Sequence, residues 1–243
     1  MFSDYNCRIF DTCKFESLKN DGADVSLLPE FENIKKDIEA MTRIGFHTFY
    51  CPIRYNDSIS VTQTQRSLLK LKKYFQKVIP RNCGKISVNF VPQLYLSSDA
   101  PYIKNISALA IKNSNRVFVE LPLELNPDYI PETLNKLLFS CRLLPIFLEF
   151  QLFVAIYDPT EIEKMLRING AAFQFNIRSA FEPQNVKIIK KILSNGNTVL
   201  LGTNCKHDFL NVKEINRSIE KLKKAVGEEM FLKIILNSKK FLS

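Results

Sequence analysis

The sequence predicts an α/β protein built as a distorted seven-stranded barrel. Seven short runs rich in β-branched and aromatic residues alternate with amphipathic helical patterns along the chain of 243 residues. Most runs are apolar on both faces, which is typical of parallel strands covered by helices. Because no composition break, low-complexity segment or internal repeat divides the chain, we expect one domain over residues 1–243.

The elements follow from local patterns and punctuation. Pro131 opens one expected helix, Asp158 and Pro159 precede another, and several glycines follow helix ends, namely Gly45, Gly170 and Gly196. The expected strands are 8–10, 47–52, 86–92, 116–122, 144–150, 172–177 and 198–203. The expected helices are about 29–44, 60–78, 128–142, 159–168, 183–195, 212–226 and 228–237. A closed barrel is favoured over an open nucleotide-binding sheet, because the chain lacks G-x-G-x-x-G and G-x-x-x-x-G-K.

The N-terminal sequence, the length of the apolar runs and the cysteine spacing indicate where in the cell the protein is expected. The N-terminus carries acidic residues early and has no long apolar core, so it does not read as a signal peptide. No apolar run approaches the roughly 18 residues that a membrane span needs. The six cysteines show no C-x-x-C spacing, which suits a reducing compartment. We therefore expect a cytoplasmic protein without a membrane span.

The formal net charge of +9 raises the question of an anionic partner. Lysines cluster in 70–77, 187–191 and 220–229. Each cluster falls on an amphipathic helix whose other face is apolar, and none carries a recognised nucleic-acid motif. The clusters are interpreted as solvated helix faces, and nucleic acid is not an expected partner.

In a barrel, residues that follow the strands converge on one mouth, where chemistry is built. One of them, Glu149, stands at the end of the apolar run "LPIFLEF" and needs a partner there. The other tip residues are also mostly polar: Thr12, Cys13, Lys14, Ile53, Arg54, Gln93, Glu120, Asn176, Arg178, Asn204, Lys206 and His207.

Four segments carry a resemblance to a known family: "NDGA" (20–23), "RVFVELPLELNPDYIPETLNKLLFSCRLLPIFLEF" (116–150), "ILSNGNTVLLGTNCKH" (192–207) and "IEKLKKAVGEEMFLKIILNSKKFL" (219–242). In this order they resemble the bacterial manganese-dependent tyrosine-protein phosphatases of capsule and exopolysaccharide operons, within the polymerase and histidinol phosphatase (PHP) superfamily. The resemblance covers nearly the whole chain. It implies a PHP-type barrel whose metal cluster activates water against a phosphotyrosine ester.

Most metal-ligand positions of that family hold other residues here. The His-x-His after the first strand falls on Thr12 and Lys14, and the His after the second strand on Ile53. The later ligands, and the Glu and Arg that follow the fifth-strand His, fall on Gln93, Glu149, Asn204, Lys206, Gln151 and Leu152. Asp21, Glu120 and the basic residue Arg54 match the pattern.

The replacements argue against a metal cofactor. Manganese, iron and zinc sites need deprotonated nitrogen, sulfur or oxygen ligands, and a protonated Lys has no lone pair to give. We expect no metal and no other cofactor, with a single weak divalent ion on Asp21, Glu120 and Glu149 as the alternative. In place of the metals we expect an ion-pair or anion-binding cluster of Lys14, Asp21, Arg54, Glu120, Glu149, Arg178 and Lys206.

Three functions stay open at this point. The first is a pseudophosphatase with a binding or regulatory role in capsule, exopolysaccharide or tyrosine-phosphorylation systems; its candidate partners are a phosphotyrosine protein, a phosphosugar and the tyrosine-kinase or polysaccharide machinery. The second is residual or altered hydrolysis of phosphotyrosine or a phosphosugar. Within it, Cys13 and Cys205 are weighed as nucleophiles, the latter near His207, although no catalytic residue is assigned. The third is a purely structural role, since fold alone does not fix function.

Overall fold

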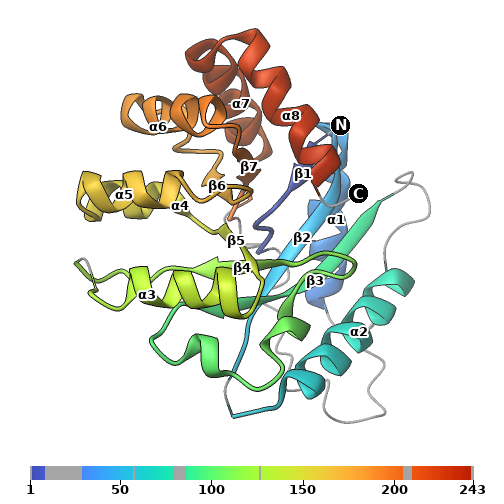
Figure 1. Ribbon diagram of the computed structural model, residues 1–243. Coiled ribbons are helices and arrows are strands. Elements are labelled where there is room, and N and C mark those ends of the chain that lie inside the picture. Colours follow the sequence, from blue (N-terminus) through green and yellow to red (C-terminus); the bar gives the residue numbers. More distant parts are fainter. Residues whose placement is uncertain are drawn as a thin grey trace.

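The computed structural model describes residues 2–8, 29–56, 58–78, 86–125, 127–204 and 210–241. Seven parallel strands form one sheet whose spatial order is the chain order (Figure 1). They are β1 (Phe2–Asp4), β2 (Phe46–Arg54), β3 (Ser87–Tyr95), β4 (Arg116–Glu120), β5 (Leu144–Phe147), β6 (Ala172–Asn176) and β7 (Thr198–Gly202). The predicted α/β architecture with seven strands is confirmed.

The two edge strands meet and nearly close the sheet into a barrel. Just beyond β1, the Tyr5 N–H donates to the Leu201 carbonyl of β7 at 3.0 Å. The fully buried Asp4 carboxylate accepts from the Thr203 N–H at 3.0 Å and from the Thr203 hydroxyl at 2.6 Å. Burial raises the pKa of Asp4, against the effect of these hydrogen bonds. Asp4 therefore links the first and last strands through hydrogen bonds of its side chain, and we call it the clasp between β1 and β7.

Helices surround the sheet and follow the strands in alternation (Figure 1). Their bounds are α1 (Pro29–Arg43), α2 (Val61–Val78), α3 (Ile130–Asn135), α4 (Phe150–Ile156), α5 (Pro159–Leu166), α6 (Pro183–Ser194), α7 (Val212–Val226) and α8 (Glu228–Phe241). Short 3-10 turns occupy η4 (Ala100–Tyr102) and η5 (Ile106–Leu109), and a π-helical turn, η6 (Lys136–Ser140), continues α3. None of the helices that the structure describes combines the length and apolarity required to cross a bilayer.

Helix boundaries follow the capping chemistry of the sequence. The Asp158 side chain accepts from the Thr160 N–H and starts α5, with Pro159 in its first turn. At the start of α2, Ser60 and Gln63 form a reciprocal capping box, with N···O distances of 2.9 and 3.2 Å. These contacts place the N-terminus of α2 next to the end of β2, beside the barrel mouth.

Two apolar clusters hold the barrel together. The larger one lies between the sheet and the helices. The smaller one fills the barrel interior and consists of Tyr5, Tyr50, Val91, Ile111, Phe118, Ile146, Leu148, Ala172 and Leu200. The end of α8 packs onto this interior cluster through Phe241, whose ring centroid lies 3.9 Å from the Arg116 guanidinium carbon. Because Arg116 begins β4, α8 covers the barrel end opposite the mouth.

Two sequence-based boundaries were wrong, and one strand was missed. The first strand of the sheet lies at 2–4, where "FSD" is short and partly polar and gives no hydrophobic signal. Of the strand expected at 8–10, residue 8 is not in a strand, and residues 9 and 10 lie outside the described residues. The strand expected at 144–150 ends at Phe147, and Phe150 begins α4, a helix that the sequence did not predict. Phe150 and Phe153 are buried, so the apolar run continues past the strand and hides the change of structure. The helix expected over 128–142 is divided between α3 and η6.

Candidate functional site

Polar side chains from all seven strands, or from the residues just after them, form one hydrogen-bonded chain across the barrel mouth. We call this chain the mouth network. Its members, in order of contact, are Arg54, Glu120, Gln93, Arg8, Asn6, Glu149 and Asn204. Gln174 joins the network by accepting from Asn6 and from the Glu149 N–H. The network occupies the end of the barrel where enzymes of this architecture keep their chemistry.

The first part of the network is a two-pronged ion pair. Arg54 at the end of β2 donates to both oxygens of Glu120 at the end of β4, with Nη2···Oε1 at 2.5 Å and Nε···Oε2 at 3.1 Å. The buried Gln93 amide also donates to Glu120 Oε2. The guanidinium carbon of Arg54 lies 5.0 Å from the Tyr95 ring centroid. Both carboxylate oxygens of Glu120 therefore have donors from the protein itself.

The second part comes from the segment that follows β1. Arg8 Nε donates to Asn6 Oδ1 at 3.2 Å, and Arg8 Nη2 donates to Gln93 Oε1 at 3.1 Å. Since β1 lies six residues before the strand expected at 8–10, the two residues that leave it at the spacing assigned to Thr12 and Lys14 are Asn6 and Arg8. An amide and a guanidinium therefore follow the first strand at this spacing, while Thr12 and Lys14 lie outside the described residues and their roles stay predictions.

Glu149 lies at the centre of the network. It has φ 51° and ψ 40°, a left-handed backbone that is uncommon for a residue with a side chain, and it precedes α4. Its N–H donates to Gln174 Oε1 at 2.9 Å. Its carboxylate accepts from Asn6 Nδ2 at 3.3 Å and from Asn204 Nδ2 at 2.7 Å. In the part of the chain that the structure describes, neutral amides thus hold this carboxylate.

The environment of Glu149 disfavours its charge. Burial raises the pKa of the Glu149 carboxyl, while the hydrogen bonds and the charge of Arg8 act in the opposite direction. At pH values between the ordinary pKa of Glu in the unfolded chain and its raised pKa in the folded protein, the native state binds more protons than the unfolded state. Stability from this group is therefore fully present at low pH and is lost as the pH rises through the folded pKa.

We accordingly expect Glu149→Gln to flatten the pH dependence of stability. The free energy of unfolding of the parent should fall more steeply from mildly acidic to neutral pH than that of the variant, because only the parent ionises there. Urea denaturation at several pH values measures the difference. Asp4 makes the same contribution to the pH dependence of the free energy of unfolding in both proteins, so this contribution cancels in the comparison. Parallel curves for the two proteins would show that Glu149 titrates as it does in the unfolded chain.

Close packing at β6 and β7 lets these side chains meet. Gln174 is fully buried, and its Oε1 accepts from the Glu149 N–H and, at 3.5 Å, from Asn6 Nδ2. Its Nε2 has no hydrogen-bond partner among the described atoms. A Cβ at Gly202 would lie 2.7 Å from Gln174 Nε2 and 2.8 Å from the Asn6 nitrogen and Cβ. Glycine is therefore required where Asn6, Gln174 and β7 converge.

The other predicted site residues have different positions. Arg178 Nε lies 3.5 Å from Glu214 Oε2 of α7, so this ion pair joins the β6 loop to a helix. That Arg178 belongs to the ion-pair or anion-binding cluster expected at the barrel mouth stays a prediction. Ile53 packs against the large apolar cluster. Several predicted residues lie outside the described residues: Thr12, Cys13, Lys14, Asp21, Cys205, Lys206 and His207.

Sequence reasoning missed Asn6, Arg8 and Gln174. Asn6 and Arg8 carry the same two-residue spacing that was sought later in the chain, so this spacing in "SDYNCR" was the available signal. Gln174 is the one strongly polar residue inside the apolar run "AFQF", which marks a side chain with a buried partner.

The donor set of the mouth network does not fit a manganese, iron or zinc cluster. Such sites need imidazole, thiolate or carboxylate ligands, whereas this network consists of amides, two guanidiniums and two carboxylates that accept hydrogen bonds from them. Within the described ranges, no group of three or more His, Cys, Asp or Glu side chains is arranged to hold a metal ion. The alternative of one weak ion on Asp21, Glu120 and Glu149 stays a prediction.

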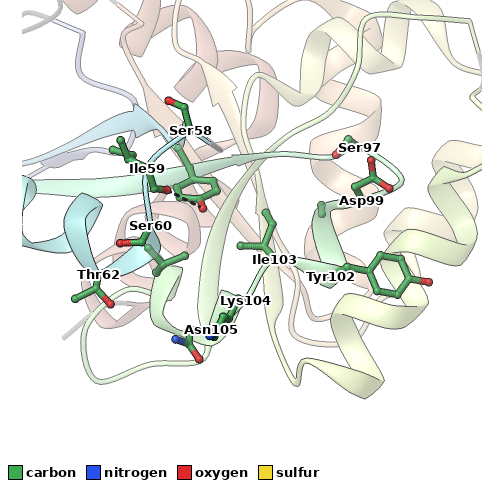
Figure 2. A pocket seen from close by; sticks show the side chains of 13 residues that line it. Ser58, Ile59, Ser60, Thr62, Ser97, Asp99, Tyr102, Ile103, Lys104 and Asn105 are labelled. Carbon is green, nitrogen blue, oxygen red and sulfur yellow. Dashed lines mark hydrogen bonds between the residues drawn. The ribbon is translucent and has the colours of Figure 1, made fainter.

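A groove of about 840 Å³, lined by both polar and apolar side chains, lies beside the mouth, between the loop after β2 and the loop after β3 (Figure 2). Figure 2 shows Ser58, Ser60 and Thr62 along one wall and Ser97 and Asp99 along the other. Tyr55, which directly follows Arg54, lines the groove and donates from its hydroxyl to the Ile59 carbonyl at 3.1 Å. The groove therefore opens next to the Arg54 end of the mouth network.

Comparison with known proteins identifies the fold. No protein-family model matches the chain, and no curated protein matches it in sequence. Among solved structures, the chain is similar to one in a study of YwqE from Bacillus subtilis and CpsB from Streptococcus pneumoniae, described as unique metal-dependent tyrosine phosphatases. The similarity has a TM-score of 0.67 with 15% sequence identity, and covers 99% of this chain and 94% of that chain. The predicted distorted seven-stranded α/β barrel is confirmed, and at this identity the likeness shows the fold alone.

Proposed function

We propose that this protein is a non-hydrolysing homologue of PHP-type tyrosine-protein phosphatases that has a binding or regulatory role. The setting that we propose for it is a capsule, exopolysaccharide or tyrosine-phosphorylation system. Two observations support the proposal. The fold is similar to that of metal-dependent tyrosine phosphatases, and most side chains at the barrel mouth are not of the types that ligate such metals.

One observation carries the proposal: Arg8 and Asn6 leave β1 and hydrogen-bond to Gln93 and to Glu149 across the mouth. Metal-dependent hydrolysis requires a cation that lowers the pKa of a bound water. A guanidinium repels such a cation and cannot ligate it, because it is always protonated and has no lone pair. Arg8 and Arg54 moreover balance the charges of Glu120 and Glu149.

A phosphorylated ligand is the form of binding that the mouth favours. Arg54 has 57% of its side chain exposed, so its ion pair with Glu120 is solvated and contributes at most about 1 kcal/mol. A phosphate group could displace Glu120 and accept the same two N–H donors. Lys14 and Lys206 are proposed to add positive charge there. A phosphotyrosine protein or a phosphosugar would supply such a group.

Residual hydrolysis is the second candidate function. Its support is Glu149, a buried carboxyl with a raised pKa at the barrel mouth, which is the property of a general acid. In that case the reaction would be slow hydrolysis of a phosphoric monoester.

Two assays on the full chain separate these functions. Incubation with para-nitrophenyl phosphate and with a phosphotyrosine peptide, each with added manganese, should release no phosphate above the buffer rate. Phosphotyrosine should raise the melting temperature of the parent, because a ligand that binds only the native state stabilises it. The Arg54→Gln variant should lose that shift while keeping the melting temperature of the unliganded parent to within a few degrees.

The outcomes bear on different parts of the proposal. Manganese-dependent turnover would contradict the non-hydrolysing assignment. An equal melting shift in the parent and in Arg54→Gln would remove the Arg54 end of the mouth as the phosphate site.

A further inference from the structure

The groove beside the mouth has an apolar side chain between two polar walls. Its volume of about 840 Å³ lies in the range of sites that enclose small molecules. Figure 2 shows Ile103 between the wall that carries Ser60 and Thr62 and the wall that carries Asp99. A ligand that fits this groove therefore combines an apolar face with a polar rim.

Hydrogen bonds within the protein hold one wall in place. The Ser58 hydroxyl donates to Asn56 Oδ1 at 2.7 Å, and the Ser60 hydroxyl donates to Gln63 Oε1 at 3.1 Å. A wall that is already ordered loses little conformational freedom when a ligand binds, so more of the contact energy appears as affinity.

The rest of the lining contains polar groups that the protein itself does not use. The side chains of Ser97, Asp99 and Asn105 line the groove, and none of the three has a hydrogen bond or ion pair within the described part of the chain. A carboxylate accepts hydrogen bonds, whereas a hydroxyl and an amide both donate and accept them. This set of groups complements the hydroxyls of a ligand, because each such hydroxyl also donates and accepts.

Tyr102 extends the groove with an aromatic ring that is 68% exposed and points away from the wall of Ser60 and Thr62 (Figure 2). Lys136 Nζ lies 2.5 Å from the Tyr102 hydroxyl oxygen and 4.9 Å from the ring centroid. At these two distances the ammonium lies beyond the hydroxyl and covers neither face of the ring. An open aromatic face attracts C–H groups, which one face of a sugar ring presents.

Two other classes of ligand fit the groove less well. An extended peptide that adds to a sheet needs a free strand edge. The groove lies between the loops after β2 and β3, and each of these strands is paired on both sides within the sheet. Nucleic acid needs several basic contacts to its phosphates, whereas this groove is lined by the Asp99 carboxylate as well as by Lys104.

We propose that this groove is a binding site for a neutral oligosaccharide. The hydroxyls of one sugar unit meet Ser97, Asp99 and Asn105, and its apolar face lies on Ile103. A neighbouring unit stacks on Tyr102. This site goes beyond the proposed function, because it requires neither a phosphate group nor a ligand in the mouth.

A microarray of neutral and phosphorylated glycans, probed with the labelled full chain, tests the proposal. We expect neutral oligosaccharides to bind, and the affinity of the best one is then measured by titration calorimetry. Asp99→Ala should weaken that binding about tenfold, the effect of losing hydrogen bonds to a charged acceptor. Asn105→Gly should weaken it about threefold, because glycine keeps the left-handed backbone (φ 61°) and removes only the amide.

Two controls assign the effect to the groove. Asp128→Ala removes the same charge from an exposed residue of a different pocket, beside α3 and α5, and should bind like the parent. Asp99 is exposed and its side chain caps no helix, so Asp99→Ala should keep the melting temperature of the parent.

Each contrary outcome overturns the proposal. A microarray without any bound neutral glycan would remove the saccharide site. Equal weakening by Asp99→Ala and Asp128→Ala would place the binding elsewhere on the molecule. Binding confined to phosphorylated glycans would assign the ligand to the mouth. Because neutral glycans carry no phosphate, failure of the phosphotyrosine melting shift would leave this result unaffected.

Discussion

Gly202→Ala is expected to lower the free energy of unfolding by about 2 to 3 kcal/mol, the cost of overpacking a fixed interior site. The added Cβ would lie 2.7 Å from Gln174 Nε2 and 2.8 Å from the Asn6 nitrogen. Gln174 Nε2 ends a side chain that is fully buried, and the Asn6 nitrogen belongs to the backbone, which cannot give way without moving β1. The variant should therefore push β1 and β6 apart at the mouth. Urea denaturation measures the change.

The matched control is Gly196→Ala. Gly196 has a positive φ, but no atom lies within 4 Å of the position that its Cβ would take, so the substitution carries only a backbone cost of about 1 kcal/mol. The Gly202 variant should be clearly less stable than this control. If the two variants lose the same stability, Asn6, Gln174 and Gly202 converge more loosely than these distances indicate.

Asp4→Ala should be the second strongly destabilising change, with a loss of about 3 kcal/mol or more. The substitution removes the acceptor for the Thr203 N–H, the Thr203 hydroxyl and the Asn6 N–H, all of which are buried. Asp4→Asn keeps an acceptor oxygen and removes the charge that burial disfavours, so its loss should be much smaller. Thermal and urea denaturation of both variants provide the comparison. Equal stability of the two would show that Asp4 is not the clasp between β1 and β7.

The sequence predicted most of the barrel because the strands from β2 to β7 are strongly apolar. Their boundaries differ from the predicted ones by a few residues at most, and Pro159 and Asp158 start α5 as expected. The first strand could not be found in this way, because Asp4 and Asn6 make its region polar even though both are fully buried. Burial of polar groups depends on partners far along the chain, and Thr203 and Glu149 are those partners.

The candidate site was predicted in part. The ion pair of Arg54 with Glu120 joins two residues that the sequence had placed in one cluster. Glu149 was also expected at the mouth, but its described partners are Asn6 and Asn204. Because the sequence did not predict β1 at 2–4, it did not place Asn6 and Arg8 at the mouth. The role expected of Lys14 stays a prediction, since that residue lies outside the described residues.

The central claim is that basic and amide side chains occupy the mouth of this barrel, although its fold is similar to that of metal-dependent tyrosine phosphatases. Elemental analysis of the protein, purified without chelators and supplied with manganese, iron and zinc, tests it most directly. We expect well below one metal ion per chain, with no change in melting temperature on addition of a chelator. Stoichiometric metal that stabilises the fold and is lost to the chelator would contradict the account.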